Sequence, residues 1–148
     1  MPVASPKLLD ALGRPTHPGE LAKFPALSMQ EHEGPQTWEL IDASGERTNV
    51  EVNARLICGD FAVLLEAARR GLGVAMLPEF VRAPAVTRGE LDVLLPEWSA
   101  PEGTMHFIYP SRRGMLPGVR ALVDFLAERL PAATLQKHEQ CKRRSLSD

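Results

Sequence analysis

The stretch that decides the fold is ARLICGDFAVLLEAARRGLGVAMLP, which covers residues 54–78. Residues 55–58 have the composition of a strand, and Asp60 can open a helix. Apolar residues then recur at i, i+3, i+4 and i+7 and share one helical face: Phe61, Leu64, Leu65 and Ala68. Gly71 can end this helix in the left-handed conformation, and residues 74–77 form an apolar strand. Strand, helix and strand in this order predict a βαβ unit with parallel strands and a right-handed crossover.

The residues before this unit predict two short helices and a hairpin. Ser5 can cap a helix that starts at Pro6, and a second helix follows Pro18. A short strand is expected over residues 26–30. Apolar and polar residues then alternate over 38–42 and 50–53 around a turn at 43–46, which is typical of a half-buried hairpin.

The residues after the unit predict one more helix, two strands and a long final helix. The helix covers residues 78–86, and Leu91, Val93 and Leu95 alternate as a strand. Residues 96–103 read as a connector, and residues 105–109 as a strand. The final helix begins at Pro117, and from residue 131 its pattern fades into a polar tail. Its expected buried side comprises Val119, Leu122, Val123, Leu126 and Leu130.

Composition narrows the classes of function. The length of 148 residues fits one domain, or one and a part, and 44% hydrophobic residues are enough for a folded core. The formal net charge of -2 argues against a free-standing nucleic-acid binder, because such a protein usually has a basic surplus. No apolar run reaches the length of a membrane span, and no export signal stands at the start, so we expect a cytoplasmic protein. Cys58 and Cys141 form no CxxC pair and are expected to be free thiols.

The sequence offers little for catalysis or for metal binding. The four histidines share no spacing that suits a metal: His17, His32, His106 and His138. There is no GxSxG elbow, phosphate loop or HExxH motif. We therefore expect no catalytic residue, no metal and no cofactor.

The order of motifs resembles that of LysR-type transcription regulators. The matching pieces, in chain order, are residues 4–6, 13–15 and 18–21, the Trp38–Glu39–Leu40 hairpin with Gly45, the helix and strand over 60–78, and residues 91–98 and 109–113 before the final helix. Together they span roughly residues 3 to 130. Each piece is weak alone, but their common order is specific.

The resemblance implies an α/β fold, a periplasmic-binding-protein type 2-like lobe with a mixed sheet and flanking helices. The effector domain of the family has two such lobes with a small molecule between them. On that pattern residues 1–18 are a remnant of lobe one, 19–98 form lobe two, 99–130 return to lobe one, and 131–148 are a polar tail. The first lobe is thus incomplete, and the helix-turn-helix that would bind DNA is expected to be missing.

The resemblance also implies a small, in many members anionic, effector bound against helix N-termini. The candidate residues are Cys58, Gly59, Asp60 and Phe61. Exposed backbone N–H groups and the helix dipole favour anions there. We expect Gly59 and Phe61 to contact the effector and Asp60 mainly to cap the helix. A plain strand-to-helix turn is the alternative.

The same helix has a second implied role, as the surface that packs against lobe one of a partner subunit in a homodimer or tetramer. The candidate residues are Leu64, Ala67 and Ala68. The alternative is a helix that packs only on its own sheet.

Three other identities stay open at this point. A periplasmic-type solute-binding protein shares the lobe fold, and a small α/β enzyme would need a nucleophile and base that the sequence does not show. A truncated chain without independent activity would leave apolar faces uncovered at Leu8, Leu12, Phe107 and Leu122, which predicts self-association.

Overall fold

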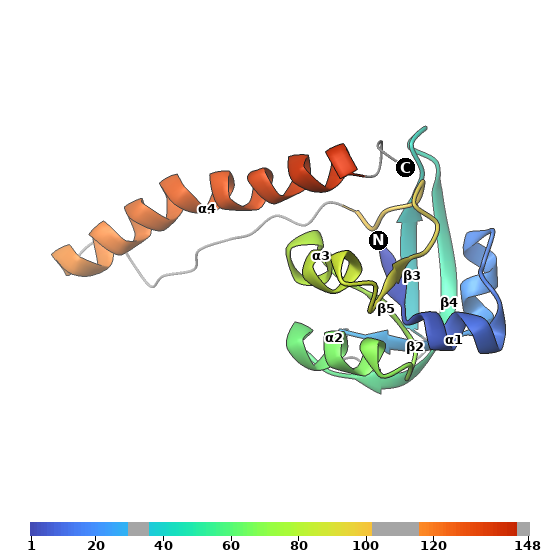
Figure 1. Cartoon of the computed structure of the whole chain (residues 1–148). Coiled ribbons are helices and arrows are strands. Elements are labelled where there is room, and N and C mark those ends of the chain that lie inside the picture. The colour runs from blue at the N-terminus through green and yellow to red at the C-terminus, as the bar shows by residue number, and fades with distance from the viewer. Residues whose placement is uncertain (30–35, 102–115, 145–148) are drawn as a thin grey trace. The chain divides into compact units, whose positions relative to one another are not determined.

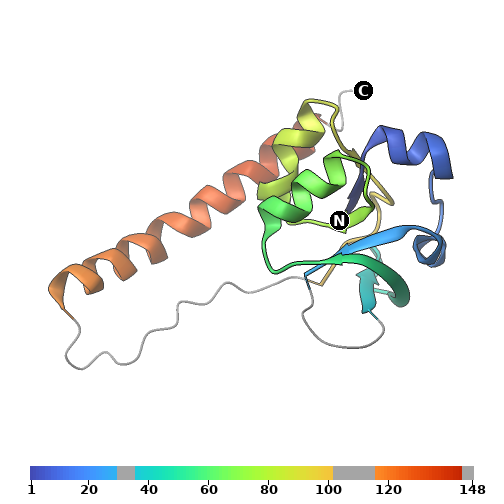
Figure 2. The same cartoon turned by 90° about the horizontal axis from the view of Figure 1, so that it is seen from below.

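A computed structural model describes residues 1–29, 36–101 and 116–144. The chain divides into two compact units, Met1–Pro101 and Glu102–Asp148. Among the described residues, the first unit is a six-stranded sheet with helices packed on both of its faces (Figures 1 and 2). This arrangement confirms the predicted α/β class with flanking helices.

The sheet is mixed, as predicted. Its strands are β1 (Pro2–Ala4), β2 (Pro25–Ser28), β3 (Gln36–Ile41), β4 (Arg47–Ile57), β5 (Val74–Met76) and β6 (Asp92–Val93), in the spatial order β3-β4-β2-β5-β1-β6. The strand β2 pairs in parallel with both β4 and β5. All other pairs are antiparallel, including the predicted hairpin of β3 and β4.

The βαβ unit differs from its prediction in two ways. Helix α2 (Phe61–Arg69) does connect two parallel strands, but β2 lies between β4 and β5, so the two strands are not neighbours. The two strands predicted over residues 50–53 and 55–58 are one continuous strand, β4, which ends at Ile57 and leaves Cys58 outside it. This strand pairs with β3 along its first half and with β2 along its second, with a register shift near Ala54.

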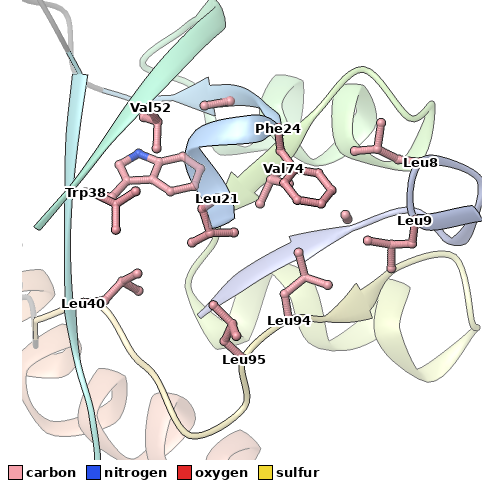
Figure 3. Close-up of a cluster of buried hydrophobic side chains, with 13 residues drawn as sticks. Leu8, Leu9, Leu21, Phe24, Trp38, Leu40, Val52, Val74, Leu94 and Leu95 are labelled. Atoms are coloured by element: carbon pink, nitrogen blue, oxygen red, sulfur yellow. The ribbon is translucent and has the colours of Figure 1, made fainter. Parts of the chain in front are cut away.

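Both faces of the sheet are covered because consecutive strand residues point to opposite sides. One face packs on α1 (Pro6–Leu12) and the 3-10 helix η1 (Pro18–Lys23) and includes Leu9, Trp38 and Val74 (Figure 3). The other face packs on α2 and α3 (Glu79–Thr87). Figure 3 shows side chains from distant parts of the sequence meeting in the first cluster.

Glycines in the left-handed backbone conformation end both α2 and α3. For α2, the sequence predicts this end at Gly71. Gly71 has a φ of 76°, and the N–H of Leu72 donates to the carbonyl of Ala67 at 3.0 Å. At the end of α3, Gly89 has a φ of 69°, and the N–H of Glu90 donates to the carbonyl of Ala85 at 2.9 Å. Both ends are Schellman motifs, which glycine favours because a Cβ is costly at positive φ.

The strand predicted at Leu91, Val93 and Leu95 is shorter than expected. Only Asp92 and Val93 are in β6, and the neighbours Leu94 and Leu95 are both buried. Leu95 has a φ of 49°, so the chain turns there and the alternation of strand side chains ends.

Helix α4 (Pro117–Arg144) belongs to the second unit and is longer than expected, since it continues past residue 131. The expected buried side is not buried: Val119 is 44% and Leu122 is 55% exposed. The strand predicted at residues 105–109 lies outside the described residues, as does Phe107. Leu8 is buried in its own unit, whereas Leu12 is 52% exposed.

Because apolar side chains of α4 are exposed, self-association of the chain stays a prediction. We expect the sedimentation coefficient to rise with protein concentration, and Leu122→Glu to reduce this rise. A concentration-independent monomer would contradict the prediction.

Candidate functional site

The parallel strands β2, β4 and β5 end at one edge of the sheet. Ser28 and Ile57 are paired at the ends of β2 and β4, and the N–H of Cys58 donates to the carbonyl of Ser28 at 3.0 Å. Helices α2 and α3 begin just beyond β4 and β5. We call residues 28–29, 57–61 and 77–80 the carboxyl edge. In open α/β sheets, ligands bind outside the carboxyl ends of the strands.

The four predicted effector residues all lie on the carboxyl edge. Gly59 and Asp60 are exposed, whereas Cys58 and Phe61 are half-buried. The carboxylate Oδ1 of Asp60 accepts from the N–H of Ala62 at 2.7 Å, which confirms the predicted role of Asp60 as the N-cap of α2. Contact of Gly59 and Phe61 with an effector stays a prediction.

The cap can be tested by substitution. Asp60→Ala is expected to lower the free energy of unfolding by about 1 kcal/mol, since the N–H of Ala62 loses its acceptor. Asp60→Asn is the matched control, because its amide oxygen can cap equally well without the charge. Urea denaturation measures both variants. Equal losses in the two would show that the charge of Asp60 matters rather than its capping bond.

Apolar side chains are exposed on the carboxyl edge next to the predicted residues. Met29 is 39%, Ile57 45% and Phe80 42% exposed. The ring of Phe80 meets that of Phe61 edge-on, with centroids 6.5 Å apart. Sequence reasoning missed Met29, Ile57 and Phe80. The sequence places Phe80 just beyond a predicted parallel strand, but the position of Met29 and Ile57 at the same edge follows only from the parallel register of β2 and β4.

A buried cation also reaches this end of the sheet. Arg82, in the first turns of α3, is 6% exposed, and its Nη2 donates to Sδ of Met1 at 3.3 Å. Its buried Nε has no hydrogen-bond partner among the described residues. Sequence reasoning missed Arg82 as well. Its spacing of three residues from the buried Ala85 was the available signal, because i and i+3 share a helical face.

Comparisons with known proteins agree with this geometry. The family model described as the LysR substrate binding domain matches residues 1–131. The chain belongs to this LysR domain family. It is 34% identical over 128 residues to the HTH-type transcriptional regulator PtxR of Pseudomonas aeruginosa, covering 86% of this chain and 41% of PtxR. An HTH-type regulator of Xanthomonas campestris is 32% identical, and 38% of it is covered.

Solved LysR-type structures share the fold. The regulatory domain of CrgA from Neisseria meningitidis matches with a TM-score of 0.67 and 27% identity, covering 86% of this chain and 62% of that one. The regulatory domain of AphB from Vibrio vulnificus matches with a TM-score of 0.61 and 29% identity, covering 68% and 50%. The chain spans about two fifths of the length of the curated relatives it matches.

The residues predicted to form a dimer interface are buried in the interior of the LysR domain. Leu64 is 1%, Ala67 7% and Ala68 0% exposed, and all three pack in the cluster between α2 and the sheet. The prediction that these side chains face a partner is therefore wrong, because the helix uses this face to cover its own sheet. Val63, 45% exposed, lies on the outward face of α2.

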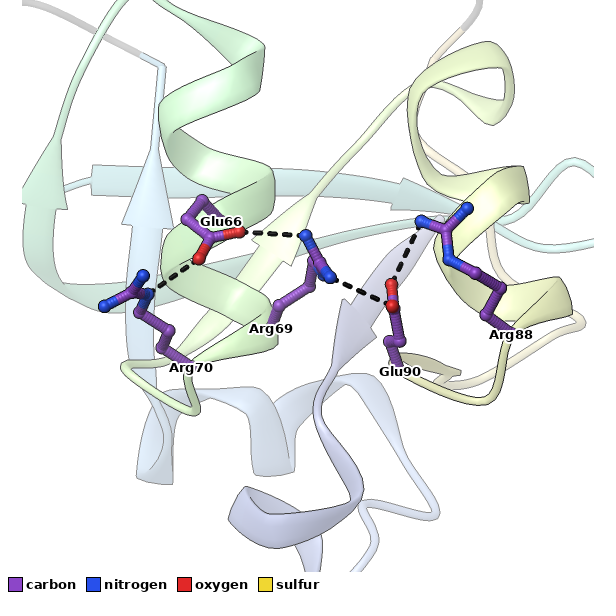
Figure 4. Close-up of polar contacts among 5 residues, drawn as sticks. All are labelled: Glu66, Arg69, Arg70, Arg88 and Glu90. Carbon is purple, nitrogen blue, oxygen red and sulfur yellow. Dashed lines mark hydrogen bonds and ion pairs between the residues drawn. The ribbon is translucent and has the colours of Figure 1, made fainter.

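An ion-pair network joins the far end of α2 to the loop after α3 (Figure 4). Glu66 accepts from Arg69 at 2.9 Å and from Arg70 at 2.7 Å. Glu90 accepts from Arg69 at 2.9 Å and from Arg88 at 3.1 Å. These contacts place paired, ionised carboxylates at the surface, where they stabilise local structure modestly.

The network predicts a pH dependence of stability. Hydrogen bonds from the guanidinium groups of Arg88 and Arg69 hold the pKa of Glu90 below its usual value. A lowered folded pKa contributes stability that is present above the unfolded pKa and is lost as the pH falls through the folded pKa. We expect Glu90→Gln to lower the melting temperature at pH 7 and to have no effect in strong acid.

The control for this pH dependence is Glu97→Gln, which removes the same charge at an exposed position. Thermal melts of the three proteins from pH 7 to strong acid measure the effect. If the two variants differed from wild type equally at every pH, the ion pairs of Glu90 would not account for the result.

In the part of the chain that the structure describes, no group of three or more metal-ligating side chains comes together. Within the same residues, no helix has the length and apolar character needed to cross a membrane.

Proposed function

We propose that this LysR domain senses a small molecule for a DNA-binding transcription regulator and that the molecule binds at the carboxyl edge. The observation that carries the proposal is the exposure of Met29, Ile57 and Phe80 at an edge where two helices begin. Exposed apolar side chains beside helix N-termini suit a ligand with an apolar body and polar groups. The curated relatives are named as transcription regulators.

The proposed mechanism is a population shift. An effector changes the conformation of a regulator only if it binds two conformations with different affinity. An effector that contacts the carboxyl edge and a second lobe would favour the closed arrangement of the two. In a full-length regulator, that shift would reposition the DNA-binding heads.

The partners and the location are part of the same proposal. We infer a homodimer or tetramer in the full-length regulator, DNA contact through a separate N-terminal domain, and a cytoplasmic location beside the DNA. The chain acts as a binding module and not as an enzyme. With a net charge of -2, it is not expected to bind operator DNA by itself. Sequence-specific gel-shift by these 148 residues would contradict this inference.

The experiment is a binding screen by NMR. A panel of small aromatic and aliphatic metabolites, both charged and neutral, is titrated into the ¹⁵N-labelled chain. We expect a ligand of the panel to shift the amides of residues 57–61 and 77–80 saturably. Phe61→Ala should lower the affinity for that ligand by about tenfold or more, because it removes a large apolar contact.

The matched control is Val63→Ala, an apolar truncation on the exposed face of the same helix. It should leave the affinity unchanged. Saturable shifts confined to the far end of α2, residues 66–70, would contradict the proposed site. A panel with no binder at all would contradict it too.

A further inference from the structure

Arg82 is a buried cation whose hydrogen bonds are incomplete. The side chain is 6% exposed, and Nη2 donates to the thioether of Met1 at 3.3 Å. The neighbouring donor Nε is buried without a partner among the described residues. A thioether is a weak acceptor. A buried guanidinium is costly unless a carboxylate or a comparable acceptor satisfies it, and within residues 1–29, 36–101 and 116–144 Arg82 lacks the partner that its burial calls for.

Arg82 lies next to the carboxyl edge, on the side of β1. Pro2 pairs with Met76, the last residue of β5, so Met1 lies level with the end of that strand. Arg82 reaches Met1 from α3, the helix that follows β5. Residues two apart on a helix do not share a face, so Arg82 and the exposed Phe80 approach the edge from different sides of α3.

The electrostatic environment at this position is positive. Burial and the charge of Arg82 lower the pKa of the Met1 amino group to about 6, while Glu79 raises it. Glu79, in the first turn of α3, is the nearby acidic group that acts on Met1. The N-terminal end of α3 adds the positive end of its dipole. An anion placed there gains from the charge of Arg82 and from the helix dipole, whereas burial and the charge of Glu79 oppose it.

We propose that Arg82 binds the carboxylate of a small anionic ligand at the β1 side of the carboxyl edge. Nε and Nη2 are adjacent donors on one edge of the guanidinium, which matches the two oxygens of a carboxylate. On binding, Nη2 exchanges the sulfur of Met1 for one oxygen, and Nε gains the other. The inference rests on the proposed function and adds to it the chemical class of the ligand and the residue that selects it.

The test compares an acid with its neutral amide. Phenylacetate and phenylacetamide are titrated into the complete ¹⁵N-labelled chain at constant ionic strength, and the Nε–H signal of Arg82 is followed. We expect phenylacetate to shift this signal saturably and phenylacetamide to bind at least about tenfold more weakly, since charge-assisted hydrogen bonds carry such factors. Inorganic phosphate forms a further arm, and we expect it to bind more weakly than the carboxylate.

Variants at Arg82 separate its role from general charge. Arg82→Met should abolish saturable binding of phenylacetate, whereas Arg70→Met, which removes the same charge from the far end of α2, should leave binding unchanged. Arg82→Met replaces an unpaired buried charge with an apolar side chain and is expected to fold. Arg82→Lys keeps the charge but loses the paired donors, and it should lower the affinity for phenylacetate by about tenfold. It provides the comparison if Arg82→Met unfolds.

Several results would overturn the inference. Equal affinity for the acid and the amide, binding of phosphate but not of phenylacetate, or unchanged affinity in both Arg82 variants would each do so. If ligands of the metabolite panel shift residues 57–61 while no acid moves the Arg82 signal, the inference fails and the proposed function stands. If no ligand of any kind binds the edge, both fail.

Discussion

Replacing Gly73 with alanine is expected to lower the free energy of unfolding by about 3 kcal/mol, near the upper end for overpacking in a protein interior. A Cβ built at Gly73 would lie 2.4 Å from the carbonyl oxygen and 3.1 Å from the carbonyl carbon of Pro25. These are backbone atoms at the start of β2, so no rotamer change relieves the contact. The strands β2 and β5 would have to move apart.

Urea denaturation of the complete chain measures this effect, with Gly19→Ala as the control. A Cβ at Gly19 would meet only the flexible side chain of His17, at 3.4 Å. That variant should stay within about 0.5 kcal/mol of wild type, as substitutions without a clash usually do. If Gly73→Ala were equally mild, β2 and β5 could not be as closely packed as the distance implies.

The local features of this fold could be predicted from sequence because each depends on neighbours along the chain. The cap at Asp60, the end of α2 at Gly71 and the hairpin turn at 43–46 follow from backbone rules that act over a few residues. The exact order of the sheet could not be predicted in the same way. The insertion of β2 between β4 and β5 is set by packing between segments far apart in sequence.

The candidate site was predicted in part. Residues 58–61 could be placed at the carboxyl edge because they join a strand to a helix, but Ile57 and Met29 needed the parallel register of β2 and β4 to be known. Arg82 was missed for a different reason. Arginine is rarely buried, so the position of Arg82 among apolar residues of α3 does not by itself predict its burial.

The face of α2 was misassigned to a partner subunit because periodicity alone does not say what covers an apolar face. Small residues such as Ala67 and Ala68 permit close approach to any surface, whether it is a partner helix or the domain's own sheet. The burial of Leu64 decides between them. Its side chain packs among β-strand residues that include Leu27 and Ala75.

Leu64→Ala is therefore expected to destabilise the isolated chain by about 2–5 kcal/mol, the range for buried leucines. The loss combines the transfer energy of the removed atoms with the cavity left between α2 and the sheet. Because the contact is within one chain, the loss should not depend on protein concentration. Urea denaturation at two concentrations that differ tenfold measures both properties.

Val63→Ala provides the matched control on the neighbouring position. Val63 is 45% exposed, so its truncation should cost less than about 0.5 kcal/mol. If Leu64→Ala were as mild as Val63→Ala, or if its cost disappeared when the protein was diluted, Leu64 would stabilise an assembly of subunits. The opposite result leaves only the outward face of α2, on which Val63 lies, for contact with a partner subunit.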